Sequence, residues 1–230
     1  MLSRALQRGP RISILLYALI VSFQGAPAAQ EPATISFAFD FPGSQPDHYE
    51  FSVSSDGHAT YESHGKLNSD SEAEPFHFDF TISSTTRTRI FDLTKRAHYF
   101  EGELDSKKRD VASTGTKTLA YKDAHKSTKA TYNYSPVPVV QELTNLFQNM
   151  STTLEFGRRL EYYQRYQKLG LDDELKRMED LSKQNSLEEL AAVTPILQQI
   201  AADSSVINPV RVRAQRLLAK AGNQQRLSSR

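Results

Sequence analysis

Three side chains on one predicted strand and its neighbour could hold a metal ion. His77 and Asp79 are two residues apart, so they lie on the same polar side of a strand, and His58 lies near the adjacent hairpin. Imidazole and carboxylate groups are ligands of zinc and other divalent metals. However, polar residues are expected at alternate positions of any solvated strand, and no His-X-His or His-Glu-X-X-His spacing is present. We therefore assign no metal site and keep His58, His77 and Asp79 only as candidates.

An aromatic and basic cluster in a predicted helix could bind a partner. Tyr162 and Tyr166 are four residues apart and share one helix face, with Arg158 and Arg165 nearby. Tyrosine and arginine are enriched at the centres of protein-binding surfaces. The rings could equally pack against the preceding part of the chain, and this packing is the interpretation we favour for them. If the cluster does bind a partner, the interaction residues are Arg158, Tyr162, Arg165 and Tyr166.

Residues suited to hydrolysis are not arranged in a recognisable pattern. No Gly-X-Ser-X-Gly motif occurs. Paired acids such as Asp172–Asp173 and Glu188–Glu189 lie at predicted helix starts, where negative charge favours the helix dipole. We assign no catalytic residue and no cofactor.

The first residues have the order of a secretory signal peptide. Three arginines precede an apolar run at 12–23, which is followed by small residues at 25–29. Ala26 and Ala28 suit the −3 and −1 positions for cleavage after residue 28. The apolar run is shorter than the roughly 20 residues of a spanning helix. We predict a signal peptide at 1–28, with an uncleaved anchor as the alternative.

The amino-acid composition limits the cell compartments in which the protein is expected and the kinds of partner it can bind. The chain contains no cysteine, which excludes disulfides, thiolate metal sites and cysteine nucleophiles. An exported chain without disulfides fits a bacterial periplasm or cell exterior. Without the predicted signal peptide, the chain holds 25 Lys and Arg against 27 Asp and Glu. This balance argues against binding to nucleic acid, which needs a strong basic excess.

Residues 30–136 show the alternation of strands that bury one face. Large apolar and polar residues alternate with a period of two in several runs. An Asp56-Gly57 pair between two strand-like runs predicts a tight hairpin. The clearest alternating runs are 35–41, 49–53 and 76–82.

Two further elements complete this segment. Ser84 can cap a helix that ends near Ala97, and a last hairpin is expected within 116–134. Strands followed by a helix and a second hairpin predict an antiparallel sheet with one packed helix.

Beyond Pro138 the hydrophobic period changes to 3.6, which predicts a long helix ending near Gly170. Its apolar stripe comprises Leu143, Leu146, Phe147, Met150 and Leu154.

Three shorter helices are expected after it. One begins at Asp172, and the next opens with a Ser186–Glu189 capping box and is kinked or split at Pro195. The last ends at Gly222. Short connections between them predict an antiparallel helical array of about four helices.

The sequence thus predicts an α+β chain: an antiparallel sheet with one packed helix, followed by a C-terminal helical array. The expected parts are a signal peptide (1–28), a sheet domain (30–136), a helical domain (137–222) and a flexible basic tail (223–230).

The functional expectation rests on the charges of the two segments and on the lack of a recognisable catalytic pattern. Residues 30–136 hold 12 basic and 16 acidic residues, whereas 137–230 hold 13 basic and 11 acidic ones. The basic last helix could make weak contact with a membrane surface. We expect a non-catalytic binding or protein-interaction module of the bacterial cell envelope, periplasmic or secreted, whose partner is another exported or envelope protein. The alternative is an envelope hydrolase that could use a metal at the histidine candidates.

Overall fold

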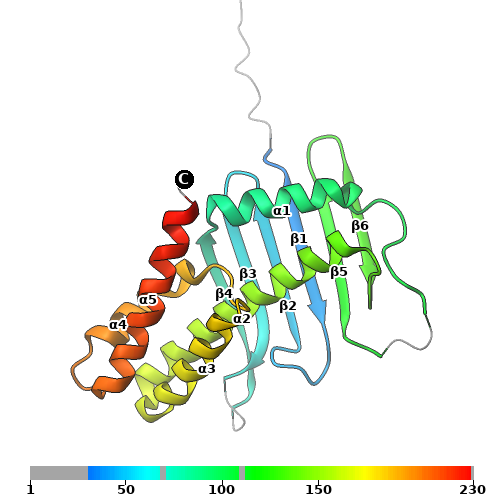
Figure 1. Cartoon of the computed structure of the whole chain (residues 1–230). Coiled ribbons are helices and arrows are strands. Elements are labelled where there is room, and N and C mark those ends of the chain that lie inside the picture. Colours follow the sequence, from blue (N-terminus) through cyan, green and yellow to red (C-terminus); the bar gives the residue numbers. More distant parts are fainter. Residues whose placement is uncertain (1–30, 68–70, 109–111, 229–230) are drawn as a thin grey trace, which may run out of the picture. The chain divides into compact units, whose positions relative to one another are not determined.

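The computed structural model describes residues 31–67, 71–108 and 112–228, with side chains placed through residue 224. The predicted signal peptide lies outside these residues. A six-stranded antiparallel sheet is followed by helices, which confirms the α+β class (Figure 1). No helix among the described residues is long and apolar enough to cross a membrane.

The sheet has the strand order β4-β3-β2-β1-β5-β6, and every neighbouring pair is antiparallel. The expected alternation is present: on β1, for example, Ile35, Phe37 and Phe39 are buried and the residues between them are not. The strands are β1 (Thr34–Asp40), β2 (His48–Ser54), β3 (His58–Lys66), β4 (Ala73–Thr81), β5 (Thr116–Lys122) and β6 (Ser127–Tyr132).

The hairpin predicted at Asp56-Gly57 joins β2 to β3. Gly57 has a φ of 102°, and its N–H donates to the carbonyl of Ser54 at 3.0 Å. Asp56 is not among the residues with positive φ. The loop therefore uses glycine at one left-handed position, rather than two such positions as in a type I′ turn.

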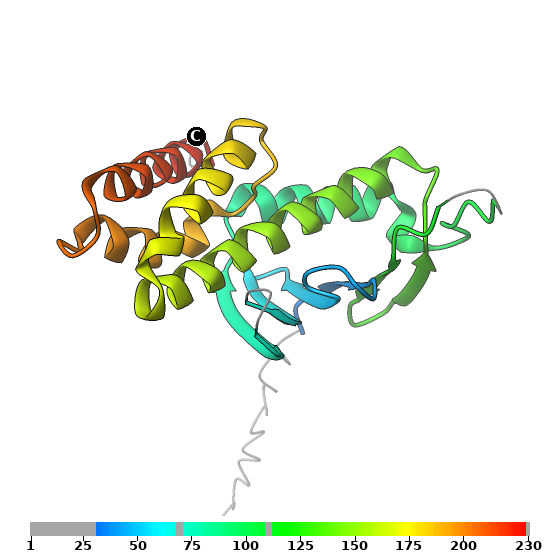
Figure 2. The same cartoon turned by 90° about the horizontal axis from the view of Figure 1, so that it is seen from below.

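Two helices cover the same face of the sheet, as Figure 2 shows. These are α1 (Ser84–Arg96) and α2 (Pro138–Tyr166). The cap of α1 is Ser83 rather than the expected Ser84, because the Ser83 hydroxyl accepts the N–H of Thr86. The other face of the sheet carries the polar members of each strand.

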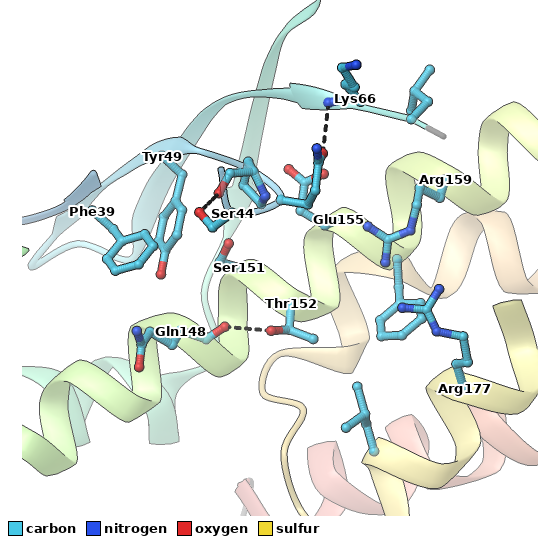
Figure 3. Close-up of a pocket in the computed structure, with 15 residues that line it drawn as sticks. Phe39, Ser44, Tyr49, Lys66, Gln148, Ser151, Thr152, Glu155, Arg159 and Arg177 are labelled. Carbon is cyan, nitrogen blue, oxygen red and sulfur yellow. Dashed lines mark hydrogen bonds between the residues drawn. The ribbon is translucent and has the colours of Figure 1, made fainter. Parts of the chain in front are cut away.

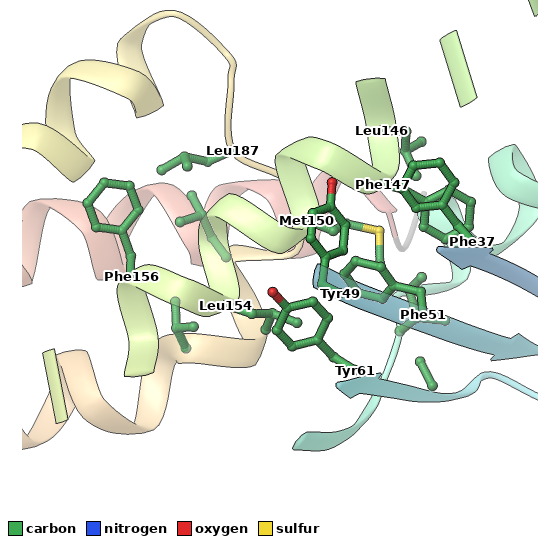
Figure 4. Close-up of a cluster of buried hydrophobic side chains, with 14 of the residues drawn as sticks. Phe37, Tyr49, Phe51, Tyr61, Leu146, Phe147, Met150, Leu154, Phe156 and Leu187 are labelled. Atoms are coloured by element: carbon green, nitrogen blue, oxygen red, sulfur yellow. The ribbon is translucent and has the colours of Figure 1, made fainter. Parts of the chain in front are cut away.

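The core is continuous across the predicted boundary at 136/137. Phe147 of α2 stacks on Phe37 with ring centroids 5.0 Å apart, and it lies 5.5 Å from Phe51 (Figure 4). All three rings are fully buried. The change of hydrophobic period thus coincides with the start of a helix that shares its core with the sheet, and the described residues belong to one compact unit.

The remaining helices are α3 (Leu171–Lys183), α4 (Thr194–Ala202) and α5 (Asn208–Ser228), with short 3₁₀ turns η1 (His98–Phe100), η2 (Lys168–Gly170) and η3 (Leu190–Val193). Of the remaining helices, α3 and α4 pack against α2, and α5 packs against α3 and α4. Gly157 lets η3 approach α2, because a Cβ at this position would lie 2.6 Å from Cγ1 of Val193.

The capping box expected at Ser186–Glu189 does not form. Glu189 has a φ of 55°, and α4 begins only at Thr194, so Pro195 lies in its first turn. The Glu189 carboxylate instead accepts the Ser83 N–H at 3.1 Å and the Ser83 hydroxyl at 2.6 Å. It therefore binds the N-terminus of α1, where a negative charge is favourable.

The expected end of the last helix at Gly222 is also wrong. Helix α5 continues to Ser228, through part of the segment expected to be a flexible tail. Gly222 is not among the glycines with positive φ, so it takes no left-handed terminating conformation.

Truncating Phe147 should weaken the sheet and the helical array together. We expect Phe147→Ala to lower the free energy of unfolding by about 3–5 kcal/mol, because it opens a cavity among buried rings. Urea unfolding followed by far-UV circular dichroism and tyrosine fluorescence should show one shared transition. Leu169→Ala, at a side chain 97% exposed, is the matched control and should change little. Two separated transitions in Phe147→Ala would show that the halves have independent cores.

Candidate functional site

A cavity of about 510 Å³ opens at one end of the sheet (Figure 3). The ends of β1, β2 and β3 and the β1–β2 connection form one wall, and α2 and α3 form the other. Apolar walls alternate with hydroxyl, carboxamide and charged groups, a composition typical of ligand sites. It is lined by Phe39, Ser44, Gln45, Pro46, Tyr49, Lys66, Leu67, Gln148, Ser151, Thr152, Glu155, Phe156, Arg159, Arg177 and Leu181.

The inner wall contains a buried carboxylate held by hydroxyl groups. Glu155 accepts hydrogen bonds from the Tyr61 hydroxyl at 2.9 Å and from Ser63 Oγ at 2.6 Å. The Tyr61 hydroxyl also lies 2.9 Å from Ser151 Oγ. Burial, followed by the charge of Glu155, raises the pKa of Tyr61, and burial raises the pKa of Tyr49. Both phenols therefore stay protonated and available as donors at neutral pH.

Arg158 is the buried counter-ion of Glu155. Its Nη1 lies 3.8 Å from Glu155 Oε2, and both side chains are nearly inaccessible to solvent. Nη2 donates to the carbonyls of Gly65 at 3.3 Å and Glu74 at 3.1 Å, at the ends of β3 and β4. The pair thus ties α2 to two strands. Moving α2 away from these strands would remove the hydrogen-bond partners of two buried charged side chains, which is unfavourable. The pair therefore constrains the position of α2 on the sheet.

The mouth of the cavity is basic. Arg159 and Arg177 both bind the buried carboxylate of Glu174, at 2.5 and 3.2 Å. Their guanidinium carbons lie 4.8 and 5.9 Å from the ring centroid of Phe156. Lys66 borders the opposite side, where its backbone N–H donates to Gln45 Oε1 at 3.2 Å, and its side chain lies on the solvent-facing side of β3.

The histidine candidates lie on the solvent-facing side of the sheet, away from this cavity. His77 contacts Asp79 at 3.0 Å and Glu62 at 3.3 Å, whereas His58 Nε2 is 4.0 Å from Asp79. The structure therefore brings the three candidates together, as alternate positions on adjacent strands require. Among the described residues, however, no group of three or more histidines and acids has a geometry that could hold a metal ion.

The structure separates Arg158 from the other three interaction candidates. Arg158 is buried in the ion pair described above, so it cannot contact a partner. Tyr162 and Tyr166 do share a face, with ring centroids 5.4 Å apart, and Arg165 lies over the Tyr166 ring at 5.9 Å. Tyr166 is 66% exposed. The cluster at the end of α2 thus comprises the exposed Arg165 and Tyr166 and the half-buried Tyr162.

The basic residues expected to face a membrane are largely engaged within the chain. Arg213 binds Asp172 and Glu179, and Arg216 binds Glu179. The Lys220 ammonium donates to the carbonyl of Ser182. These contacts hold α5 against α3 and leave less charge for a lipid surface.

Sequence patterns did not identify Glu155, Ser151 or Tyr49 as site residues. Ser63 and Lys66 have the Ser-X-X-Lys spacing of some acyl-transfer enzymes, so the expectation that the chain contains no such motif was wrong. On β3 this spacing puts the two side chains on opposite faces, and Ser63 donates to Glu155. The sequence feature that could have indicated this site is the row of polar residues along one side of the helix that became α2.

Replacing one partner of the buried ion pair should lower the free energy of unfolding more than replacing both partners. We expect Glu155→Gln to destabilise the protein by about 3–5 kcal/mol, because Arg158 loses its counter-ion in a buried position. The double variant Glu155→Gln/Arg158→Met should recover part of this loss. Chemical denaturation of both variants and of Arg158→Met measures the coupling. Additive losses would show that the two charges do not interact.

The pKa of His77 should depend on Asp79. The hydrogen bond and charge of Asp79, followed by those of Glu62, raise the pKa of the His77 imidazole above its usual value. A raised pKa means that the interaction favours the folded state at low pH and is lost as pH rises through that pKa. In Asp79→Asn, an NMR titration of the histidine ring nuclei should show a lower pKa for His77. An unchanged pKa would contradict the contact.

Comparison with known proteins gives no assignment. The chain matches no protein-family model, and no curated protein is significantly similar to it in sequence.

Proposed function

We propose that this protein is an exported, non-catalytic binding module of the bacterial envelope that holds its ligand in the cavity between the sheet end and α2 and α3. The observation that carries the proposal is the make-up of the cavity. It combines apolar walls, neutral hydrogen-bonding groups and a basic mouth within about 510 Å³. Such convergence of a few polar groups in a largely apolar recess is typical of binding sites.

The polar groups of the cavity support binding rather than catalysis. A nucleophile needs a base within hydrogen-bond reach. Ser151 Oγ instead lies against the Tyr61 hydroxyl, and Glu155 already accepts two hydrogen bonds and faces Arg158. No histidine is among the described residues that line the cavity. These groups suit a rigid recognition surface.

The proposed location rests on the residue order of the first 29 positions. A basic start, a short apolar run and small residues before position 29 are the features that signal peptidase recognises. Export of the full chain from a bacterial host, followed by mass spectrometry of the product, should give a protein that begins at Ala29. A product that retains residues 1–28 would contradict the proposal.

A second candidate site is a protein-binding surface where α2 meets α3. Tyr166 and Leu169 are 66% and 97% exposed there, and Arg165 lies over the Tyr166 ring. Exposed tyrosine beside arginine is typical of binding hot spots. This surface is separate from the cavity-lining residues, so variants can distinguish the two sites.

Native mass spectrometry of the exported chain, purified at low salt, tests the cavity as the ligand site. We expect a bound species that is lost in Thr152→Trp, because the indole fills the cavity. It should be retained in Tyr166→Ala, the variant of the second candidate site. Thermal unfolding of both variants checks that each is folded. If the bound species were lost in Tyr166→Ala and retained in Thr152→Trp, the binding site would lie at the α2–α3 turn and the cavity proposal would be wrong.

A further inference from the structure

We infer that the cavity continues as one groove along α2 and that this groove binds an extended, negatively charged oligosaccharide. This inference deepens the proposed function and rests on it. A second cavity of about 340 Å³ lies at the same end of the sheet, beside β5 and β6. Gln148 lines both cavities, so they meet at the middle of α2.

One side of α2 forms the floor of both cavities. Its lining residues recur at intervals of four and three, which keeps them on one face of a helix. This face is distinct from the one that carries Phe147 and the rest of the buried apolar stripe. At 1.5 Å per residue, positions 141 and 159 are about 27 Å apart. The polar stripe is Gln141, Asn145, Gln148, Thr152, Glu155 and Arg159.

The stripe offers the hydrogen-bonding groups that sugar hydroxyls need. Asn145 is exposed, and its carboxamide makes no hydrogen bond with the described residues. Gln141 Nε2 donates to the Tyr134 hydroxyl at 2.9 Å and to the Ser135 carbonyl at 2.8 Å, which fixes Tyr134 at the end of the groove. The Tyr134 ring is 43% exposed and can stack on the face of a sugar.

The form of the groove favours a glycan over a peptide. An extended peptide usually adds to a free strand edge, whereas a helical peptide needs apolar anchor pockets. Here the strands meet the groove at their ends, through residues such as Phe39, Lys66 and Lys117. The α2 side is polar along most of its length. The strand ends and the polar side of α2 therefore favour a glycan over either mode of peptide recognition.

Positive charge lies at both ends of the groove. Arg159 and Arg177 line one end, where they share the Glu174 carboxylate, and Lys117 lines the other. Lys117 is buried, and its ammonium donates to backbone carbonyls at 2.7–3.0 Å but has no carboxylate partner among the described residues. Its charge is therefore not neutralised by the described residues and favours an anionic group at this end of the groove.

Titration of the ¹⁵N-labelled chain, residues 29–230, with oligogalacturonates tests this inference by NMR. The hexamer should shift the amide signals of α2 from Gln141 to Arg159. It should bind at least about 100-fold more tightly than the dimer, because its ends engage both cavities at once. The methyl-esterified hexamer, which lacks the charges, should bind at least about tenfold more weakly. Added salt should weaken the binding of the acidic hexamer.

Matched variants separate the groove from general effects. We expect Asn145→Ala and Arg177→Gln each to weaken binding of the acidic hexamer by about tenfold, which is the scale of one lost hydrogen bond to a charged or polar group. Asn149→Ala and Lys176→Gln remove a carboxamide from α2 and a positive charge from α3 at positions outside the groove. These controls should bind as tightly as the unmodified chain.

The outcomes distinguish the ligand class from the site. Shifts along α2 with hexaglutamate but not with oligogalacturonate would overturn the oligosaccharide while keeping the groove. Equal affinity for dimer and hexamer would overturn the extended groove while keeping the first cavity. Shifts confined to the α2–α3 turn would overturn the groove and the proposed ligand site together. No shift with any probe would overturn the acidic oligosaccharide, and the native mass spectrometry would still decide whether the cavity holds another ligand.

Discussion

The packing of α2 against the sheet is the constraint on which the rest of the structure depends. One face of this helix buries Phe147 between the aromatic side chains of β1 and β2. Further along the same side of the helix, Gly157 admits η3 and with it the helical array. The opposite side is the polar stripe that lines the two cavities. Because both sides belong to one helix, the cavity walls are positioned by the same contacts that form the core.

Buried carboxylates fix the helical array at the sheet. Glu155 joins α2 to β3 through Tyr61, Ser63 and Arg158, and Glu189 joins the segment before η3 to the start of α1. Glu174 and Glu179 hold arginines from neighbouring helices in the same way. Such pairs add little net stability compared with apolar packing, but a displaced helix would leave a charge uncompensated. They therefore contribute mainly to the alignment of α2 and α3, which form the cavity mouth.

The sequence was sufficient for local elements and insufficient for contacts between distant residues. Alternation at 35–41 and the 3.6-residue stripe from Leu143 follow from local periodicity, and both elements formed. Glu189 was expected to cap its own helix, because Ser186 and Glu189 have the right spacing. Its carboxylate instead binds Ser83, 106 positions away in the sequence, which a local pattern cannot reveal. Arg158 was assigned to an exposed cluster for the same reason: its partners on β3 and β4 come close only in the folded chain.

The charges around the groove bear on how a ligand approaches. The solvent-facing side of the sheet mixes acids such as Glu62 and Asp79 with histidines that contact them. The groove is lined by Arg159 and Arg177 at one end and by Lys117 at the other, in a chain whose overall charge is close to zero. A local basic region in an otherwise balanced molecule attracts anions to that region without causing general adhesion to polyanions. Anionic molecules are thus attracted to the part of the molecule where α2 presents its hydrogen-bonding groups.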